Sequence, residues 1–270
     1  MIERTGAARS KEQEPRFIGA GFQKCGTSSL FSTLIRHVPF FSRPAYPKSG
    51  GKELHAIPQN RSAQEGDREA YLRALGPITP GINEPLDFTP NYAHRPTTMS
   101  NIRQMFPSVK IFLIVRNPTD RFYSALDHAK QSGQVDPNLS DFEAFKMSSS
   151  PTAPRLFGWS RNFLVHGIYV PAVNAAYRLF GQNNVFLTSL ELIQSQASQK
   201  ELARLAEFVG VDRTTFDGVA FHHTNQSQNS HRLFRNIPRT RRTKKGESSI
   251  TGFYNRWDDA LAKLLEERES

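Results

Sequence analysis

The sequence predicts an α/β fold that is P-loop-like, with a central parallel β-sheet flanked by helices. Two observations support this fold class. Short apolar segments alternate with amphipathic segments along the chain, as they do in β-α-β units. A glycine-containing loop, GFQKCGTSSL at residues 21–30, joins the first apolar segment to the first amphipathic one, and a phosphate-binding loop has this context. In such folds, ligands bind outside the carboxyl ends of the strands.

The N-terminal part of the chain supplies the first strand and helix. Residues 1–15 are polar and charged, and we expect a disordered lead-in to one domain over residues 16–270. Residues 16–22 (RFIGAGF) are short and apolar, which predicts a buried strand. Residues 27–37 place apolar side chains at helical spacing and predict a helix. Residues 40–70 are rich in proline, glycine and charge, which predicts a loop with a short polar helix.

The middle of the chain contains the most apolar strand candidate. Residues 110–115 (KIFLIV) predict a buried strand, and residues 81–86 predict a weaker one. Residues 98–106 predict a helix that ends before Pro107, because the residue that precedes a proline disfavours helical geometry. Residues 117–131 predict a helix with a proline in its first turn, where proline is tolerated.

The alternation continues after a long irregular stretch. Residues 132–160 contain SSSPTAPR, which predicts a surface loop or lid. A helix, a strand, an amphipathic helix and a final helix follow, at residues 167–180, 184–190, 200–209 and 257–267.

The composition fits a folded protein without membrane-spanning segments. Hydrophobic residues make up 37% of the 270 residues, which supports a packed core. No apolar run reaches the roughly 18–20 residues of a membrane helix, and the first residues lack the apolar stretch of a signal peptide. Cys25 is the one cysteine, so no intrachain disulfide can form, as is common in reducing compartments. We expect a cytoplasmic protein, although a luminal chain trimmed of its anchor would have the same composition.

The loop differs from an ATPase phosphate loop in the position of its lysine. Gly21 and Gly26 have the ATPase spacing, but Thr27 follows Gly26 where the G-x-x-x-x-G-K-[ST] pattern has lysine. The lysine here is Lys24, inside the turn. Backbone N–H groups at a helix start can bind phosphate with help from the helix dipole. The candidate phosphate-binding residues are therefore Lys24, Cys25, Gly26, Thr27, Ser28 and Ser29; a glycine turn with a surface lysine is the alternative.

A cation follows the strand predicted at residues 110–115. Arg116 takes the place where P-loop NTPases often carry an acidic residue for Mg²⁺. Ser124 lies further along, in the helix that follows. Together the two side chains could bind a second anionic group, the arginine in a bidentate mode. A structural salt bridge of Arg116 with Asp120 or another carboxylate is the alternative.

The stretches GFQKCGTSSL and LIVRNPTDRFYSALDHA (113–129) resemble the nucleotide-binding motifs of sulfotransferases that use 3′-phosphoadenosine 5′-phosphosulfate (PAPS). GKELHAI (51–57) and LDFTPNYAHRP (86–96) resemble stretches of the heparan sulfate 3-O- and N-sulfotransferases, and the resemblance covers about residues 16–265. It implies that the first motif binds the 5′-phosphosulfate, while Arg116 and Ser124 bind the 3′-phosphate. It also implies PAPS as sulfuryl donor, adenosine 3′,5′-bisphosphate as product and no required metal. A bacterial-type relative fits at least as well as a luminal glycan enzyme.

The resemblance also implies catalytic residues. Lys24 would neutralise the leaving oxygen, and Glu53 matches the base of the K-E-x-H-F-F stretch, with His55 next in line. Alternation along an extended segment would place both on one face, and burial would raise the pKa of Glu53 toward neutrality. Asp87 is a candidate for contact with the acceptor, and Phe88 stands where the glycan enzymes carry a lysine. Exposed loop positions for Glu53 and His55 are the alternative.

The net charge of +10 has a local source near the C-terminus. The cations between residues 232 and 245 are Arg232, Arg235, Arg239, Arg241, Arg242, Lys244 and Lys245. The resemblance implies that this arm closes over the nucleotide as a lid, with Lys244, Lys245 and Gly246 nearest to it. A solvated flexible arm is the alternative, and the surplus charge could also attract an acidic acceptor.

We therefore expect a PAPS-dependent sulfotransferase that acts on a hydroxyl of a small molecule or carbohydrate, without a nucleic-acid partner or membrane insertion. Two alternatives remain. An ATP-dependent small-molecule kinase would depend on Mg²⁺. A basic nucleic-acid-binding protein would use residues 232–245 and show steep salt dependence. The sequence leaves the acceptor, O- or N-sulfation and the oligomeric state open.

Overall fold

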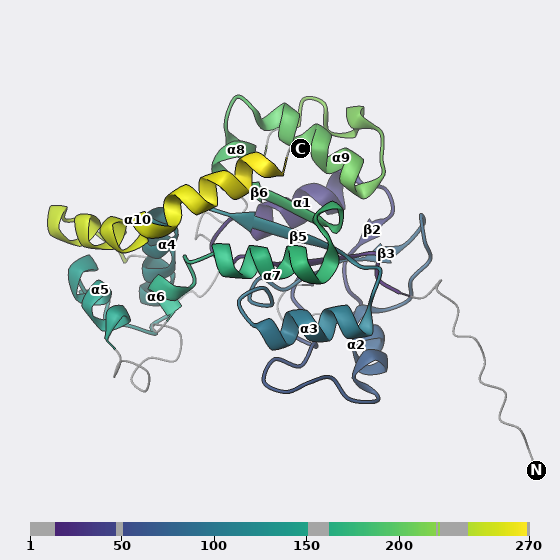
Figure 1. The fold of residues 1–270 in the computed structure, drawn as a ribbon, viewed down its shortest axis with the longest axis horizontal. Helices are drawn as coiled ribbons and strands as arrows, with labels where there is room; N and C mark the ends of the chain where they lie inside the picture. Colours follow the sequence, from purple (N-terminus) through teal and green to yellow (C-terminus); the bar gives the residue numbers. More distant parts are fainter. Residues whose placement is uncertain (1–13, 47–50, 151–161, 220, 222–236, 269–270) are drawn as a thin grey trace, which may run out of the picture.

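A parallel sheet of four strands forms the centre of the computed structural model, which describes residues 14–46, 51–150, 162–219, 221 and 237–268. The strand order is β4–β1–β5–β6, and every pairing in this sheet is parallel. The strands are β1 (Phe17–Gly21), β4 (Asp87–Phe88), β5 (Lys110–Val115) and β6 (Val185–Ser189). Helices flank the sheet (Figure 1), so the predicted α/β class is confirmed.

The helices surround this sheet and reach beyond it. They are α1 (Thr27–His37), α2 (Asp67–Leu75), α3 (Pro96–Met105), α4 (Pro118–Gln131), α5 (Asp141–Ser149), α6 (Asn162–Val165), α7 (Val170–Phe180), α8 (Leu190–Gln194), α9 (Ser198–Val209) and α10 (Lys244–Glu267), with 3₁₀ turns at Gln182–Asn184 and Arg213–Phe216. In Figure 1, α10 runs from the region of β6 to α4 and α5, and it contacts all three elements. Within the described part of the chain, every helix is too short or too polar to cross a membrane.

The strand β5 is the centre of the hydrophobic core. All of its residues from Ile111 to Val115 are buried, as expected for an apolar strand covered on both faces. The ring of Phe112 lies 5.7 Å from the ring of Phe17 and 5.9 Å from that of Phe88, centroid to centroid. This packing fixes the carboxyl end of β5, where Arg116 follows.

Two predicted elements differ from the observed ones between residues 81 and 150. The predicted strand at residues 81–86 is reduced to β3 (Glu84–Pro85), which pairs with β2 (Phe41–Ser42) outside the main sheet. The prediction of a continuous loop over residues 132–160 is wrong for α5. This helix begins with a capping box, in which Ser140 and Glu143 bond each other's backbone N–H groups. Residues 151–160, and residues 1–13 of the predicted lead-in, lie outside the described residues.

The last helix is longer than predicted, because it begins at Lys244 rather than near residue 257. The side chain of Thr243 caps it by accepting a hydrogen bond from the Gly246 N–H. Gly246, Ile250 and Tyr254 are buried at helical spacing, which gives the polar first half of the helix an internal face. Lys244, Lys245 and Gly246, which the sequence analysis assigned to a basic arm, thus form the first turn of a helix.

The start of α10 packs tightly against the start of α5. Asp141 is fully buried and accepts hydrogen bonds from the Thr243 N–H (2.7 Å), the Thr243 hydroxyl (2.8 Å) and the Tyr123 hydroxyl (2.9 Å). A Cβ atom on Gly246 would lie 2.2 Å from Cγ of Asp141. Only a residue without a side chain therefore fits at position 246, in the first turn of α10.

We predict that Gly246→Ala lowers the free energy of unfolding by about 1–3 kcal/mol, the usual cost of an overpacked site. Gly252→Ala is the matched control, since Gly252 lies in the same helix and a methyl group there would meet no described atom outside the helix within 4 Å. The control should raise the free energy of unfolding by roughly 0.5–1 kcal/mol, because alanine favours a helix over glycine. Urea denaturation of both variants tests this, and equal shifts would contradict the proposed contact.

Candidate functional site

The turn between β1 and α1 forms the predicted phosphate loop. Gly26 precedes α1 with a φ of 93°, a conformation that glycine adopts readily, and a Cβ there would lie 2.6 Å from Cδ1 of Leu190. The helix start has neither a side-chain cap nor an acidic residue in its first turn. Thr27 and Ser29 are buried at this end and Ser28 is half-buried. The backbone N–H groups and the positive end of the helix dipole suit an anion.

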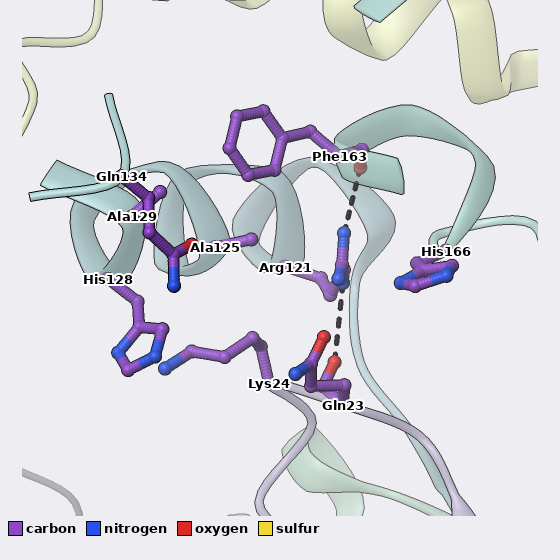
Figure 2. A pocket seen from close by; sticks show the side chains of 9 residues that line it. All are labelled: Gln23, Lys24, Arg121, Ala125, His128, Ala129, Gln134, Phe163 and His166. Carbon is purple, nitrogen blue, oxygen red and sulfur yellow. Dashed lines mark hydrogen bonds between the residues drawn. The ribbon is translucent and has the colours of Figure 1, made fainter. Parts of the chain in front are cut away.

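Lys24 lies in a small cavity between the loop and α4 (Figure 2). Its side chain points toward His128, and Arg121 and His166 also line the cavity. Burial and the charges of Arg121 and Arg116 lower the pKa of Lys24 to about 8. Lys24 is therefore mostly protonated at pH 7, and an anion bound beside it would raise its pKa.

Two arginines hold the backbone of this loop. Arg116 donates a hydrogen bond from Nη1 to the carbonyl oxygen of Lys24, at 3.4 Å. Arg121 is 1% exposed and donates to the carbonyl oxygens of Gln23 (3.3 Å) and Phe163 (2.8 Å). The sequence interpretation missed Arg121. Its signal was a long basic side chain in the first turn of the helix that follows Arg116.

The structure places Arg116 at the phosphate loop and Ser124, half-buried, on α4. Arg116 and Asp120 do not form the salt bridge that was the alternative for Arg116. Asp120 pairs instead with Arg242, and its N–H donates to the side chain of Asn117. The guanidinium of Arg116 therefore lies at the loop, at the carboxyl end of β5.

Cys25 contributes packing to the loop. Its thiol is fully buried and lies 3.3 Å from the hydroxyl oxygen of Tyr169. Burial raises the pKa of Cys25 to about 11, so the thiol stays protonated at neutral pH. The side chain thus acts as a small buried group beneath the phosphate loop.

Glu53 and His55 meet the phosphate loop through Lys52. The ammonium of Lys52 lies 2.7 Å from Oε1 of Glu53 and 3.5 Å from Oγ1 of Thr27. His55 Nε2 lies 3.1 Å from Oε2 of Glu53. Among the described residues, Lys24 and His55 are the two non-glycine residues with positive φ, at 66° and 50°. Such conformations are costly and often mark functional sites.

The expected direction of the Glu53 pKa shift is wrong. Burial acts to raise the pKa of Glu53, but the hydrogen bond with His55 and the charge of Lys52 outweigh it, so the net pKa is lowered. The carboxylate is therefore ionised at neutral pH and can accept a proton.

Asp87 supports the segment that carries Glu53. It is fully buried and accepts hydrogen bonds from the Leu54 N–H (3.1 Å), the Thr89 hydroxyl (2.6 Å) and the Tyr71 hydroxyl (3.2 Å). Burial raises the pKa of Asp87 to about 6, although these hydrogen bonds act to lower it. Through its hydrogen bond with the Leu54 N–H, Asp87 supports residues 53–55.

The basic segment before α10 is partly engaged with the protein. Lys245 places its ammonium 4.0 Å from the ring centroid of Phe142, and Arg242 pairs with Asp120 and Glu247. Lys244 begins α10, and Arg232 and Arg235 lie outside the described residues. The lid expected from this segment stays a prediction. In the portion that the structure describes, no group of three or more His, Cys, Asp and Glu side chains is arranged to hold a metal.

Comparison with known proteins identifies relatives in sequence and structure. The chain is 28% identical over 159 residues to the human bifunctional heparan sulfate N-deacetylase/N-sulfotransferase 3, covering 57% of this chain and 18% of that protein. It is 26% identical over 203 residues to the human heparan sulfate glucosamine 3-O-sulfotransferase 6, covering 75% of this chain and 54% of that protein. The chain thus spans about half or less of the length of these two relatives.

A solved structure supports the fold assignment. The crystal structure of a sulfotransferase from Alicyclobacillus acidocaldarius superposes with a TM-score of 0.67 and 20% identity, over 94% of this chain and 96% of that one. The family model of the sulfotransferase domain matches residues 14–262. These residues include the phosphate loop, Glu53 and Arg116, and the chain belongs to the sulfotransferase domain family.

Proposed function

We propose that this protein transfers the sulfuryl group of PAPS to a hydroxyl of a small molecule or carbohydrate. The main support is that Lys52 contacts both an ionised carboxylate, that of Glu53, and the hydroxyl of Thr27 in a phosphate loop. A base beside an anion site suits group transfer from a nucleotide to a hydroxyl. The names of the relatives include both N- and 3-O-sulfotransferases; the proposal takes a hydroxyl as the acceptor, and Glu53 would accept its proton.

The loop and Arg116 would hold the two ends of the nucleotide. The N–H groups at the start of α1, with Lys24, Thr27, Ser28 and Ser29, fit a 5′-phosphosulfate. Arg116 and Ser124 fit the 3′-phosphate, the arginine by paired hydrogen bonds. The bound PAPS would supply the activated sulfuryl group.

Glu53 and Lys24 would divide the chemical work. Glu53 would take the proton of the acceptor hydroxyl, and His55 would hold its carboxylate in place. Lys24 would stabilise the negative charge on the bridging oxygen as adenosine 3′,5′-bisphosphate departs. Protein cations suffice for this neutralisation, so the proposal assigns no metal. Lys244 remains a candidate for contact with the nucleotide at the start of α10.

The alternatives have less support from the residues described. A kinase would need the G-K-[ST] lysine, but Thr27 follows Gly26, and Arg116 ends the strand where an acidic residue would help to hold Mg²⁺. A nucleic-acid-binding protein would use the cations of residues 232–245 to bind phosphates, but Arg242 in this segment already pairs with the carboxylates of Asp120 and Glu247.

With a single cysteine and no membrane-spanning helix in the described part of the chain, a cytoplasmic setting is part of the proposal.

Arg116→Ala is expected to weaken the binding of adenosine 3′,5′-bisphosphate by about tenfold or more, the typical loss for a hydrogen bond to a charged group. Calorimetric titration without metal measures this. Arg178→Ala is the control, because Arg178 is exposed on α7 and its loss should leave affinity unchanged. If the wild type binds ATP–Mg²⁺ and not adenosine 3′,5′-bisphosphate, the kinase alternative replaces the proposal.

Glu53→Gln is expected to slow PAPS turnover by roughly 10²–10⁴-fold, the usual contribution of a general base. Its amide cannot take the proton of the acceptor. Release of adenosine 3′,5′-bisphosphate, with water and a panel of phenolic and sugar hydroxyls as acceptors, measures the rate. Calorimetric affinity for adenosine 3′,5′-bisphosphate should stay within about twofold of the wild type. Unchanged turnover would remove Glu53 from the proposal.

Asp87→Asn is expected to change how stability depends on pH. Because folding raises the pKa of Asp87 from 3.8 to about 6, its contribution to stability is complete below pH 4 and is lost as the pH rises to about 6. The loss is of the order of 3 kcal/mol. The variant cannot titrate at this position, so the free energy of unfolding of the wild type, measured with urea, should fall relative to that of Asp87→Asn across this window. Parallel profiles would show that Asp87 titrates normally.

A further inference from the structure

We propose that Lys52 is a second catalytic cation, which binds the sulfuryl oxygens during transfer and holds Glu53 toward the reacting group. This inference rests on the proposed function. It assigns to Lys52 a direct contact with the group that moves, whereas Lys24 serves the leaving oxygen.

Lys52 meets three oxygen atoms from three separate segments. Its ammonium lies 2.7 Å from Oε1 of Glu53, 3.3 Å from the carbonyl oxygen of Phe88 and 3.5 Å from Oγ1 of Thr27. The contact with Thr27 is the longest and the weakest of these. An oxygen of an anion bound at Thr27 could replace it without breaking the other two contacts. The ammonium is therefore placed between the predicted anion site and the predicted base.

Phe88 holds both the backbone and the side chain of Lys52 in place. Its carbonyl oxygen accepts a hydrogen bond from the Phe88 N–H at 2.7 Å, and its ammonium donates to the Phe88 carbonyl oxygen. The side chain is 12% exposed, and its ammonium lies 6.0 Å from the centroid of the Phe88 ring. A cation held in this way needs little reorganisation when negative charge develops beside it.

The two lysines serve different sides of the loop. Lys24 points into the cavity at α4, with Arg121 and His128 (Figure 2). Lys52 contacts Glu53 and Thr27 instead. A surface ion pair between neighbours would be the plain alternative for Lys52 and Glu53, but it would not require the contacts of Lys52 with Phe88 and Thr27.

The proposed step balances without another reactant. The oxygen of the acceptor forms a bond to sulfur, and the bond between sulfur and the bridging oxygen breaks. The bridging oxygen keeps the electron pair and leaves as part of adenosine 3′,5′-bisphosphate. The proton of the acceptor passes to Glu53. Lys52 donates hydrogen bonds to sulfuryl oxygens and keeps its own protons throughout.

The test compares Lys52→Met, which removes the charge at similar length, with Lys52→Arg, which keeps it. Lys52→Met should weaken calorimetric binding of PAPS by about tenfold but that of adenosine 3′,5′-bisphosphate, which lacks the sulfuryl group, by no more than about twofold. It should lower kcat for PAPS turnover by roughly 10²-fold, as loss of a transition-state donor does. Lys52→Arg should keep the PAPS preference and most of kcat.

A pH profile separates this role from a structural one. Without the charge of Lys52, the pKa of Glu53 should rise, so the acidic limb of kcat/KM should move to higher pH in Lys52→Met. Lys110→Met is the matched control, because Lys110 also donates to a backbone carbonyl oxygen, that of Phe208 at 2.9 Å. This control should change neither the profile nor the affinities.

The outcomes distinguish the two proposals. If the wild type fails to bind adenosine 3′,5′-bisphosphate, the proposed function fails, and the role of Lys52 with it. If the wild type binds it and turns over PAPS, but Lys52→Met keeps the PAPS affinity and the acidic limb, the role of Lys52 alone is overturned. Should Lys52→Met not fold, loss of the PAPS preference in Lys52→Arg would equally overturn it.

Discussion

The geometry of the site depends on one buried guanidinium. Arg121 is 1% exposed and joins the phosphate loop to the start of α6 through the carbonyl oxygens of Gln23 and Phe163. A buried charge is costly unless its donors find acceptors, so these contacts strongly favour one spacing between the loop and α4. The cavity around Lys24 follows from that spacing, and Arg116 reaches the same loop from the end of β5.

Burial and neighbouring charge act differently on the ionisable groups around the loop. Lys24 is buried beside two arginines, and both effects lower its pKa. Glu53 is also buried, but Lys52 and His55 stabilise its charged form and lower its pKa. Asp87 has only hydroxyl and N–H donors, which do not overcome the effect of burial. The carboxylate of Glu53 is therefore charged, whereas the supporting carboxylate of Asp87 holds a proton more readily.

The sequence could predict those parts of the site that are local. The strand, loop and helix at residues 16–37 are contiguous, and Arg116 directly follows β5. The apolar pattern and the glycine spacing were therefore enough to predict the phosphate loop and the position of Arg116. The roles of Lys52 and Arg121 depend on contacts between distant segments, which no local pattern contains. The start of α10 was missed because its buried face includes a glycine, Gly246, whose contact is with Asp141.

The sole cysteine of the chain makes the protein a natural background for site-specific labelling. Cys25 is fully buried, and its pKa of about 11 leaves almost no thiolate at neutral pH, the form that reacts with maleimides and nitroxide reagents. A cysteine introduced at Ile82, which is 74% exposed, would be modified selectively. A spectroscopic probe could thus be attached at that position without removing a side chain from the phosphate loop.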